Sequence, residues 1–149
     1  MGLQQDVNAA IAAAMKARDQ ARLDPLRMLK AALTNKEIEK SRALDETEAL
    51  QVVASLVKQR RDSIEQFTKG GRTDLAEKEA REITILETYL PPAIDAAELE
   101  AIVQSTIAET GAASQQDIGR VMKAVMARVA GRGADGKAVN ELVRRKLGG

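Results

Sequence analysis

The string in this chain that most suggests chemistry is a glycine-rich segment near its C-terminal end. Residues 131–138 read Gly-Arg-Gly-Ala-Asp-Gly-Lys-Ala. They match G-x-G-x-x-G, a dinucleotide-binding pattern, and G-x-x-x-x-G-K, the start of a P-loop. Both patterns must follow a β-strand, whereas a helical pattern precedes this string. Ala138 also stands where a P-loop needs a hydroxyl group on magnesium. The sequence therefore predicts no nucleotide site here.

Two interpretations of the glycine string remain. In the first, Gly131, Gly133 and Gly136 only form a turn between helices, because glycine adopts positive φ at little cost. In the second, the turn also binds phosphate, since free N–H groups at the start of the last helix lie beside Arg132 and Lys137. The basic residues that would extend this RNA-binding surface are Arg120, Lys123 and Arg144.

Positive charge is concentrated at this end of the chain. Residues 114–149 contain eight Lys and Arg against three Asp and Glu, a net charge of +5, whereas the whole chain has +1. A solvated helix face would also account for these charges, but the local excess favours a phosphate backbone as partner. Phe67 and Tyr89 are the only aromatic residues, so stacking of single-stranded bases is not expected. Any RNA should be recognised by its shape and backbone.

Side chains suited to catalysis are scarce. The chain has no His and no Cys, which excludes imidazole acid–base chemistry, thiol nucleophiles and Cys/His zinc sites. Lys40 and Ser41 are neighbours, but adjacent residues point to different faces of a helix, so they predict no Ser–Lys pair. We expect no catalytic residue, no cofactor and no metal.

A run of mixed charge extends from Lys58 to Glu65. Arg60 and Arg61 belong to this run and are placed on the polar side of a long helix, with i, i+4 ion pairs such as Arg61–Glu65. The run predicts a solvated helix face.

Apolar residues recur at helical spacing along the whole chain, and no segment alternates with period two. We therefore expect an all-α protein. Four helices are predicted over about 3–20, 25–42, 46–69 and 73–90, and three more between Asp95 and Gly148. Asp24-Pro25 is interpreted as the N-cap and first residue of the second helix. The inner face of that helix is expected to carry Leu26, Leu29, Leu33 and Ile38.

Pro91-Pro92 predicts a domain boundary, because neither proline can donate a backbone hydrogen bond. The expected domains are a helical N-terminal domain over 1–91 and a small three-helix tail over 92–149.

No stretch approaches the roughly 20 apolar residues of a membrane span, so no membrane partner is expected. The N-terminal segment lacks the apolar run of a signal peptide. Together with the absence of cysteine, this predicts a cytoplasmic location.

Several strings resemble the GatB/YqeY family, in the same order over nearly the whole chain. They are L-R-M-L-K-A-A-L-T-N-K-E-I-E-K from Leu26, Q-R-R-D-S-I-E-Q-F from Gln59, D-L-A-E-K-E from Asp74, L-E-T-Y-L-P from Leu86, D-I-G-R-V-M-K-A-V-M from Asp117 and G-R-G-A-D-G-K-A-V-N-E-L-V from Gly131. The turn of this family often reads G-R-A-D-G, and Gly133 lengthens it here.

This resemblance implies a helical N-terminal domain and a three-helix tail. The tail is similar to that of the B subunit of the glutamine-dependent aspartyl/glutamyl-tRNA amidotransferase, and to a module of some glutaminyl-tRNA synthetases, where it is associated with holding tRNA. The family label is therefore carbon–nitrogen ligase with glutamine as amido-N-donor. The chain offers neither a nucleotide fold nor an activated nucleophile, so we expect no catalysis by the chain alone.

The expected function is that of an accessory tRNA-binding protein of aminoacyl-tRNA metabolism. Its expected partners are tRNA and an aminoacyl-tRNA synthetase or amidotransferase. The alternative is a protein–protein adaptor that docks a tRNA-linked enzyme through its N-terminal helices. A third class, an enzyme of amide transfer, would release glutamate from glutamine in the presence of ATP and mischarged tRNA.

Overall fold

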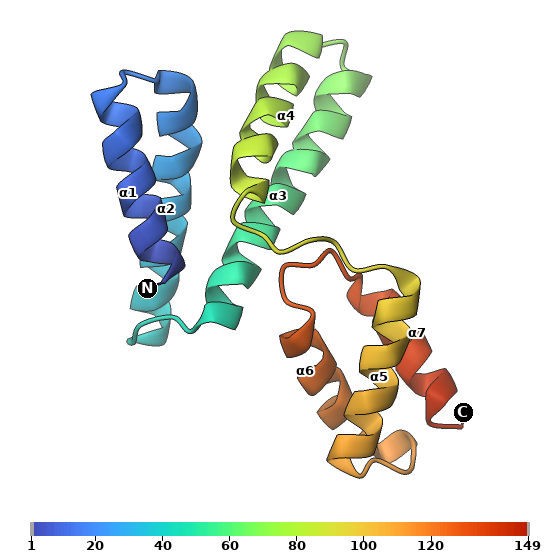
Figure 1. The fold of residues 1–149 in the computed structure, drawn as a ribbon. Coiled ribbons are helices and arrows are strands. Elements are labelled where there is room, and N and C mark those ends of the chain that lie inside the picture. Colours follow the sequence, from blue (N-terminus) through green and yellow to red (C-terminus); the bar gives the residue numbers. More distant parts are fainter. Residues whose placement is uncertain (1, 149) are drawn as a thin grey trace. The chain divides into compact units, whose positions relative to one another are not determined.

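A computed structural model describes residues 2–148, and this part of the chain is all-α, as expected (Figure 1). The chain divides into two compact units, Met1–Leu90 and Pro91–Gly149. None of the described helices is both long and apolar enough to cross a membrane. The elements in chain order are α1 (Leu3–Lys16), α2 (Gln20–Lys40), α3 (Glu46–Lys69), α4 (Thr73–Glu87), α5 (Ala96–Thr110), the 3₁₀ turn η1 (Gln115–Asp117), α6 (Ile118–Arg128) and α7 (Gly136–Lys146).

The first unit consists of two helical hairpins, α1 with α2 and α3 with α4, which pack on each other through α2 (Figure 1). Its core is aliphatic, because the apolar stripes of the four helices meet there. Burying each large aliphatic side chain contributes roughly 1.5–3 kcal/mol before entropy is considered. The most deeply buried residues are Val7, Leu26, Leu29, Leu33, Val53 and Leu86.

The start of α2 lies before the predicted Asp24-Pro25 pair. Asp19 is the N-cap, and its carboxylate accepts a hydrogen bond from the backbone N–H of Arg22 at 3.3 Å. Pro25 therefore lies inside the helix, where it is buried beside Leu26. The prediction was wrong because Pro25, the sixth residue of α2, fits the helical φ angle and gives up only one i→i−4 hydrogen bond, and its burial in the core compensates for that loss.

Ile38 is also not an inner residue of α2, as its side chain is 70% exposed. The apolar stripe of α2 ends at Leu33, and Ile38 lies on the last turn before the loop to α3. Glu37 and Lys40 of the same turn contact Gln4 of α1 and Glu48 of α3, whereas the side of the turn that carries Ile38 is left exposed.

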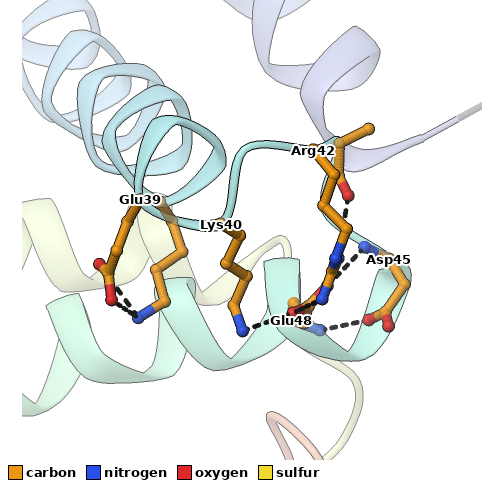
Figure 2. A network of polar contacts seen from close by, with 7 residues as sticks. Glu39, Lys40, Arg42, Asp45 and Glu48 are labelled. Carbon is orange, nitrogen blue, oxygen red and sulfur yellow. Dashed lines mark hydrogen bonds and ion pairs between the residues drawn. The ribbon is translucent and has the colours of Figure 1, made fainter.

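The corner between α2 and α3 is held by the carboxylate of Glu48 (Figure 2). Asp45 and Glu48 form the predicted capping box at the start of α3. The two Glu48 oxygens accept hydrogen bonds of 2.6 and 2.8 Å from the Arg42 guanidinium, and Lys40 approaches to 2.9 Å. These cations, Arg42 first, hold the pKa of Glu48 well below its usual range.

The second unit is a three-helix bundle of α5, α6 and α7. Its core is made almost entirely of valine, whose branched side chain packs with little rotamer freedom. The fully buried valines are Val103, Val121, Val125, Val129, Val139 and Val143.

Candidate nucleic-acid interface

The valine core fixes which side chains of α6 and α7 face outward. On α6, Val121 and Val125 are buried, whereas Arg120 and Lys123 are exposed. Residues three or four positions apart share one face of a helix, so Arg120 and Lys123 project from the same side. On α7, Lys137 and Arg144 are seven positions apart, which is about two helical turns, so these two exposed residues also share a face of their helix.

The two helices run antiparallel, as a contact at their far end shows. The Gln115 side-chain amide donates a hydrogen bond of 3.1 Å to the backbone carbonyl of Arg144. The segment that begins α6 is therefore beside the last turn of α7. Arg120, near the start of α6, lies toward the same end of the pair as Arg144.

The turn between α6 and α7 contains two glycines with left-handed backbone conformations. Gly131 has φ of 75° and Gly133 has φ of 78°, a region that is unfavourable for residues with a Cβ atom. Gly136 differs from them, because it is the first residue of α7 and has no positive φ. The turn therefore needs glycine at two of the three predicted positions.

Arg132 is used to hold the turn together and is not a free phosphate ligand. Its Nε donates to the Pro92 carbonyl at 2.8 Å, and its Nη2 pairs with the Glu98 carboxylate at 3.0 Å. The Arg132 carbonyl in turn accepts a 2.8 Å hydrogen bond from the N–H of Ile94. Because these contacts occupy a guanidinium that is only 20% exposed, Arg132 is removed from the candidate contacts.

The N-terminus of α7 is also occupied. The Asp135 side chain accepts a hydrogen bond from the backbone N–H of Lys137 at 3.3 Å. An aspartate in the N-cap position satisfies the helix dipole that would otherwise attract an anion. The phosphate site expected at this helix start is therefore already filled by a carboxylate of the chain.

Carboxylates neutralise further basic residues of this unit, and most of these carboxylates come from α5. Lys146 lies 2.6 Å from Glu100, and its ammonium group lowers the pKa of that carboxyl. Arg128 forms an ion pair with Glu109 and donates to the Thr106 hydroxyl at 2.9 Å. The excess of +5 counted over 114–149 is thus partly compensated by residues outside that segment.

Arg120 has a carboxylate partner within its own helical segment. It approaches Asp117 to 2.9 Å. The pKa of Asp117 is lowered, first by hydrogen bonds from the backbone N–H groups of Ala113 and Ser114, and then by Arg120. Arg120 is therefore a weaker candidate for phosphate contact than the sequence predicts.

Three of the predicted contacts keep an uncompensated charge. Within residues 2–148, no carboxylate lies within ion-pair distance of Lys123, Lys137 or Arg144. The Nε of Arg144 donates to the Asn140 side chain at 2.7 Å, which orients the guanidinium without neutralising it. Arg145, which was not among the predicted contacts, is exposed and likewise lacks an ion pair among the described residues. We refer to Lys123, Lys137 and Arg144 as the α6–α7 basic surface.

The charged run in α3 also differs from its prediction. Arg60 is buried, with 5% of its surface exposed, and it lies 3.7 Å from both Glu79 and Glu82 of α4. Arg61 pairs with Glu87 at 3.2 Å, while Glu65 pairs with Lys69. The run is therefore a contact between α3 and α4 and not only a solvated face.

Comparison with known proteins gives a match over almost the entire chain. A family model described as "Yqey-like protein" matches residues 4–147. Curated relatives are proteins named Altered inheritance of mitochondria protein 41, mitochondrial. The protein of Kluyveromyces lactis is 46% identical over 88 residues, which are 58% of this chain and 45% of that protein. That of Lachancea thermotolerans is 39% identical over 99 residues, 64% of this chain and 53% of that protein.

A longer alignment is found with the protein of the same name from Pyrenophora tritici-repentis, which is 25% identical over 137 residues, 91% of this chain and 75% of that protein. The chain spans about half the length of the first two relatives. All three are named as mitochondrial proteins, and this finding overturns the expected cytoplasmic location. The absence of cysteine was too weak a basis for that expectation, because a low disulfide content does not distinguish one reducing compartment from another.

Proposed function

We propose, since this chain belongs to the YqeY-like protein family, that it is an accessory tRNA-binding protein of aminoacyl-tRNA metabolism. Its second unit resembles the tail of the B subunit of the glutamine-dependent tRNA amidotransferase, a carbon–nitrogen ligase. The chain would hold tRNA for a separate enzyme, such as an amidotransferase or an aminoacyl-tRNA synthetase. The observation that carries the proposal is the α6–α7 basic surface, whose three cations have no carboxylate partner within residues 2–148.

The three cations of the α6–α7 basic surface favour a modest affinity for tRNA and recognition of its phosphate backbone. Each phosphate that a Lys or Arg contacts releases condensed counterions, so log Kobs falls by roughly 0.7–0.9 for each tenfold rise in salt per contact. The near absence of aromatic residues removes base stacking as a source of affinity. The surface is therefore suited to the phosphate backbone of a folded RNA, whose sequence it would not read.

The test is a binding titration of the full chain against total tRNA at several salt concentrations. The variant Lys123→Gln/Lys137→Gln/Arg144→Gln should bind at least about tenfold more weakly at low salt, while its helical circular dichroism is unchanged. The matched control is Lys16→Gln/Lys30→Gln/Lys58→Gln, which removes the same charge from exposed positions of the first unit. Equal loss in both variants, or no loss in the first, would contradict the proposal.

A second candidate function is a protein–protein adaptor that docks a tRNA-linked enzyme through its N-terminal helices. It is favoured by the exposed large apolar side chains of the first unit, of which Met15 lies on α1 and Ile38 on α2. Such side chains gain free energy when a partner covers them. The variant Met15→Lys/Ile38→Lys should then lose a co-purifying aminoacyl-tRNA synthetase or amidotransferase after ribonuclease treatment, while the variant of the α6–α7 basic surface retains it.

A further inference from the structure

The first unit contains an open pocket between α2, α3 and α4. Its volume is about 560 Å³, which is within the usual range of small-molecule sites. The residues of its lining that decide its chemistry are Asp24, Arg27, Arg60, Lys78, Glu79 and Glu82. None of them belongs to the α6–α7 basic surface, so this pocket is independent of the proposed RNA contact.

Arg60 on the floor of this pocket is an incompletely paired buried cation. It is 5% exposed, and its Nε–H has no hydrogen-bond acceptor in the described part of the chain. The hydrogen bond that its guanidinium does donate goes to the Met28 sulfur at 3.2 Å, and a thioether is a weak acceptor. Burying such a donor without an acceptor is unfavourable, so a ligand oxygen would be stabilised there once the flanking side chains shift to admit it, because the Nε atom itself is fully buried.

Two carboxylates flank the same guanidinium without satisfying it. Glu79 and Glu82 each lie 3.7 Å from the Arg60 Nε, which is close enough for charge attraction but too far for a hydrogen bond. Neither carboxylate accepts a hydrogen bond from any residue that the structure describes. The floor thus holds two negative charges against one positive charge, and all three groups have unused hydrogen-bonding capacity.

The rim of the pocket has the opposite balance. Asp24, Arg27 and Lys78 are exposed there, and their formal charges sum to +1. The pocket as a whole is therefore neutral, with a negative floor and a positive rim. A ligand with only a negative charge would be repelled by Glu79 and Glu82. A ligand with only a positive charge would leave the Arg60 Nε–H without an acceptor. A ligand whose ammonium group and carboxylate are bonded to the same carbon satisfies both conditions.

We propose that this pocket binds a small zwitterion of the free α-amino-acid class. The ligand ammonium group donates hydrogen bonds to Glu79 and Glu82, and a carboxylate oxygen accepts from Arg60. Arg27 and Lys78 at the rim add attraction for the carboxylate. The remaining volume receives the amino-acid side chain.

The experiment uses the full chain and each standard L-amino acid in turn, with thermal shift as a screen and calorimetric titration as the measurement. At least one amino acid should bind saturably with a Kd of about 1 mM or lower and raise the melting temperature. Its N-acetyl and carboxamide derivatives, which each lack one charge, should bind at least about tenfold more weakly. Absence of saturable binding by every amino acid, or equal binding of the derivatives, would overturn the proposal.

Variants locate the bound amino acid. Arg27→Met and Lys78→Met change exposed rim residues and should weaken binding without unfolding the chain, and Glu82→Gln should do the same from the floor. The matched controls are Arg81→Met and Glu77→Gln, which are exposed on α4 and lie outside the pocket lining. Binding that survives all three pocket variants, or that the controls weaken equally, assigns the amino acid to another site and overturns the proposal.

Discussion

Arg42 and Glu48 face each other across the α2–α3 corner, joined by hydrogen bonds of 2.6 and 2.8 Å between the guanidinium and both carboxylate oxygens (Figure 2). The same carboxylate accepts the backbone N–H of Asp45 at 3.1 Å. Glu48 thus joins the end of α2 to the first turn of α3, and this arrangement requires that its carboxyl group is ionised.

This contact makes the stability of the first unit depend on pH. The folded chain holds the pKa of Glu48 well below its usual value, which is about 4.3 in unfolded peptides. The contribution of Glu48 to the free energy of unfolding is therefore complete above about pH 5. It is lost as the pH falls further, because the unfolded chain then binds a proton that the folded chain does not. Asp74 in the first unit has a lowered pKa as well, and Glu100 and Asp117 give the second unit a pH dependence in the same direction.

Glu48→Gln should accordingly lower the melting temperature at neutral pH, and the difference in melting temperature from the unmodified chain should narrow between about pH 5 and pH 3. Glu46→Gln is the control, since Glu46 is exposed in the same helical turn. Thermal unfolding followed by circular dichroism over that pH range measures both. A gap that stays constant with pH would show that the charge of Glu48 is not the cause.

Gly133→Ala should destabilise the second unit by about 1–2 kcal/mol, the cost of a left-handed conformation for a residue with a Cβ atom. Steric crowding is not the cause of this loss of stability, because a Cβ atom at Gly133 would have no other atom within 4 Å. Gly136→Ala is the matched control, because Gly136 is a helical residue with equally free surroundings. It should be neutral or stabilise by about 0.4–1 kcal/mol. Urea unfolding separates these outcomes, and equal effects would argue against the role of φ.

Arg132→Met should destabilise the second unit while leaving tRNA affinity almost unchanged. The substitution removes the hydrogen bonds to Pro92 and Glu98, at a cost of about 1–2 kcal/mol. Stability is measured by urea unfolding and affinity by titration at a temperature where both proteins are folded. A large loss of affinity in a stable, folded variant would return Arg132 to the RNA contacts.

The helical fold could be predicted from the spacing of apolar residues and from capping signals. The capping box of Asp45 and Glu48 and the inner leucines Leu26, Leu29 and Leu33 follow from local rules alone. The start of α2 was predicted wrongly at Pro25, because in a sequence a proline a few residues into a helix looks the same as a proline at the first helical position. That choice depends on which carboxylate caps the helix, and both Asp19 and Asp24 are suitable by residue type.

The charge of the candidate site could not be predicted in the same way, because ion pairs depend on tertiary contacts. Glu98, Glu100 and Glu109 lie on α5, outside the segment whose charge was counted, and each neutralises a basic residue of that segment. The burial of Arg60 did have a signal in the sequence. It lies three residues after Val57 and seven after Val53, on the apolar stripe of α3, and its charge alone suggested a solvated position.

The distinction between paired and unpaired cations predicts different salt dependences of tRNA binding. Lys137→Gln removes a charge of the α6–α7 basic surface and should reduce the slope of log Kobs against log salt by about one. Lys146→Gln removes a charge that Glu100 already compensates, so its slope should change much less. Titrations at four or more salt concentrations measure both. Equal slopes for the two variants would mean that net charge, and not the α6–α7 basic surface, determines binding.

The buried charges of Arg60 and Glu82 should be strongly coupled in stability. Arg60→Met leaves Glu82 and Glu79 close together without their cation and should cost about 3 kcal/mol, the lower end of values for buried pairs, because Glu79 stays partly in contact with water. Glu82→Gln in the same chain removes one of the two uncompensated charges, so the double variant should be more stable than Arg60→Met alone. Urea unfolding of the four proteins gives the coupling free energy. Additive effects would indicate that the 3.7 Å contacts between Arg60 and the carboxylates are too solvated to matter, and the floor of the pocket would then lack the charge arrangement on which amino-acid binding depends.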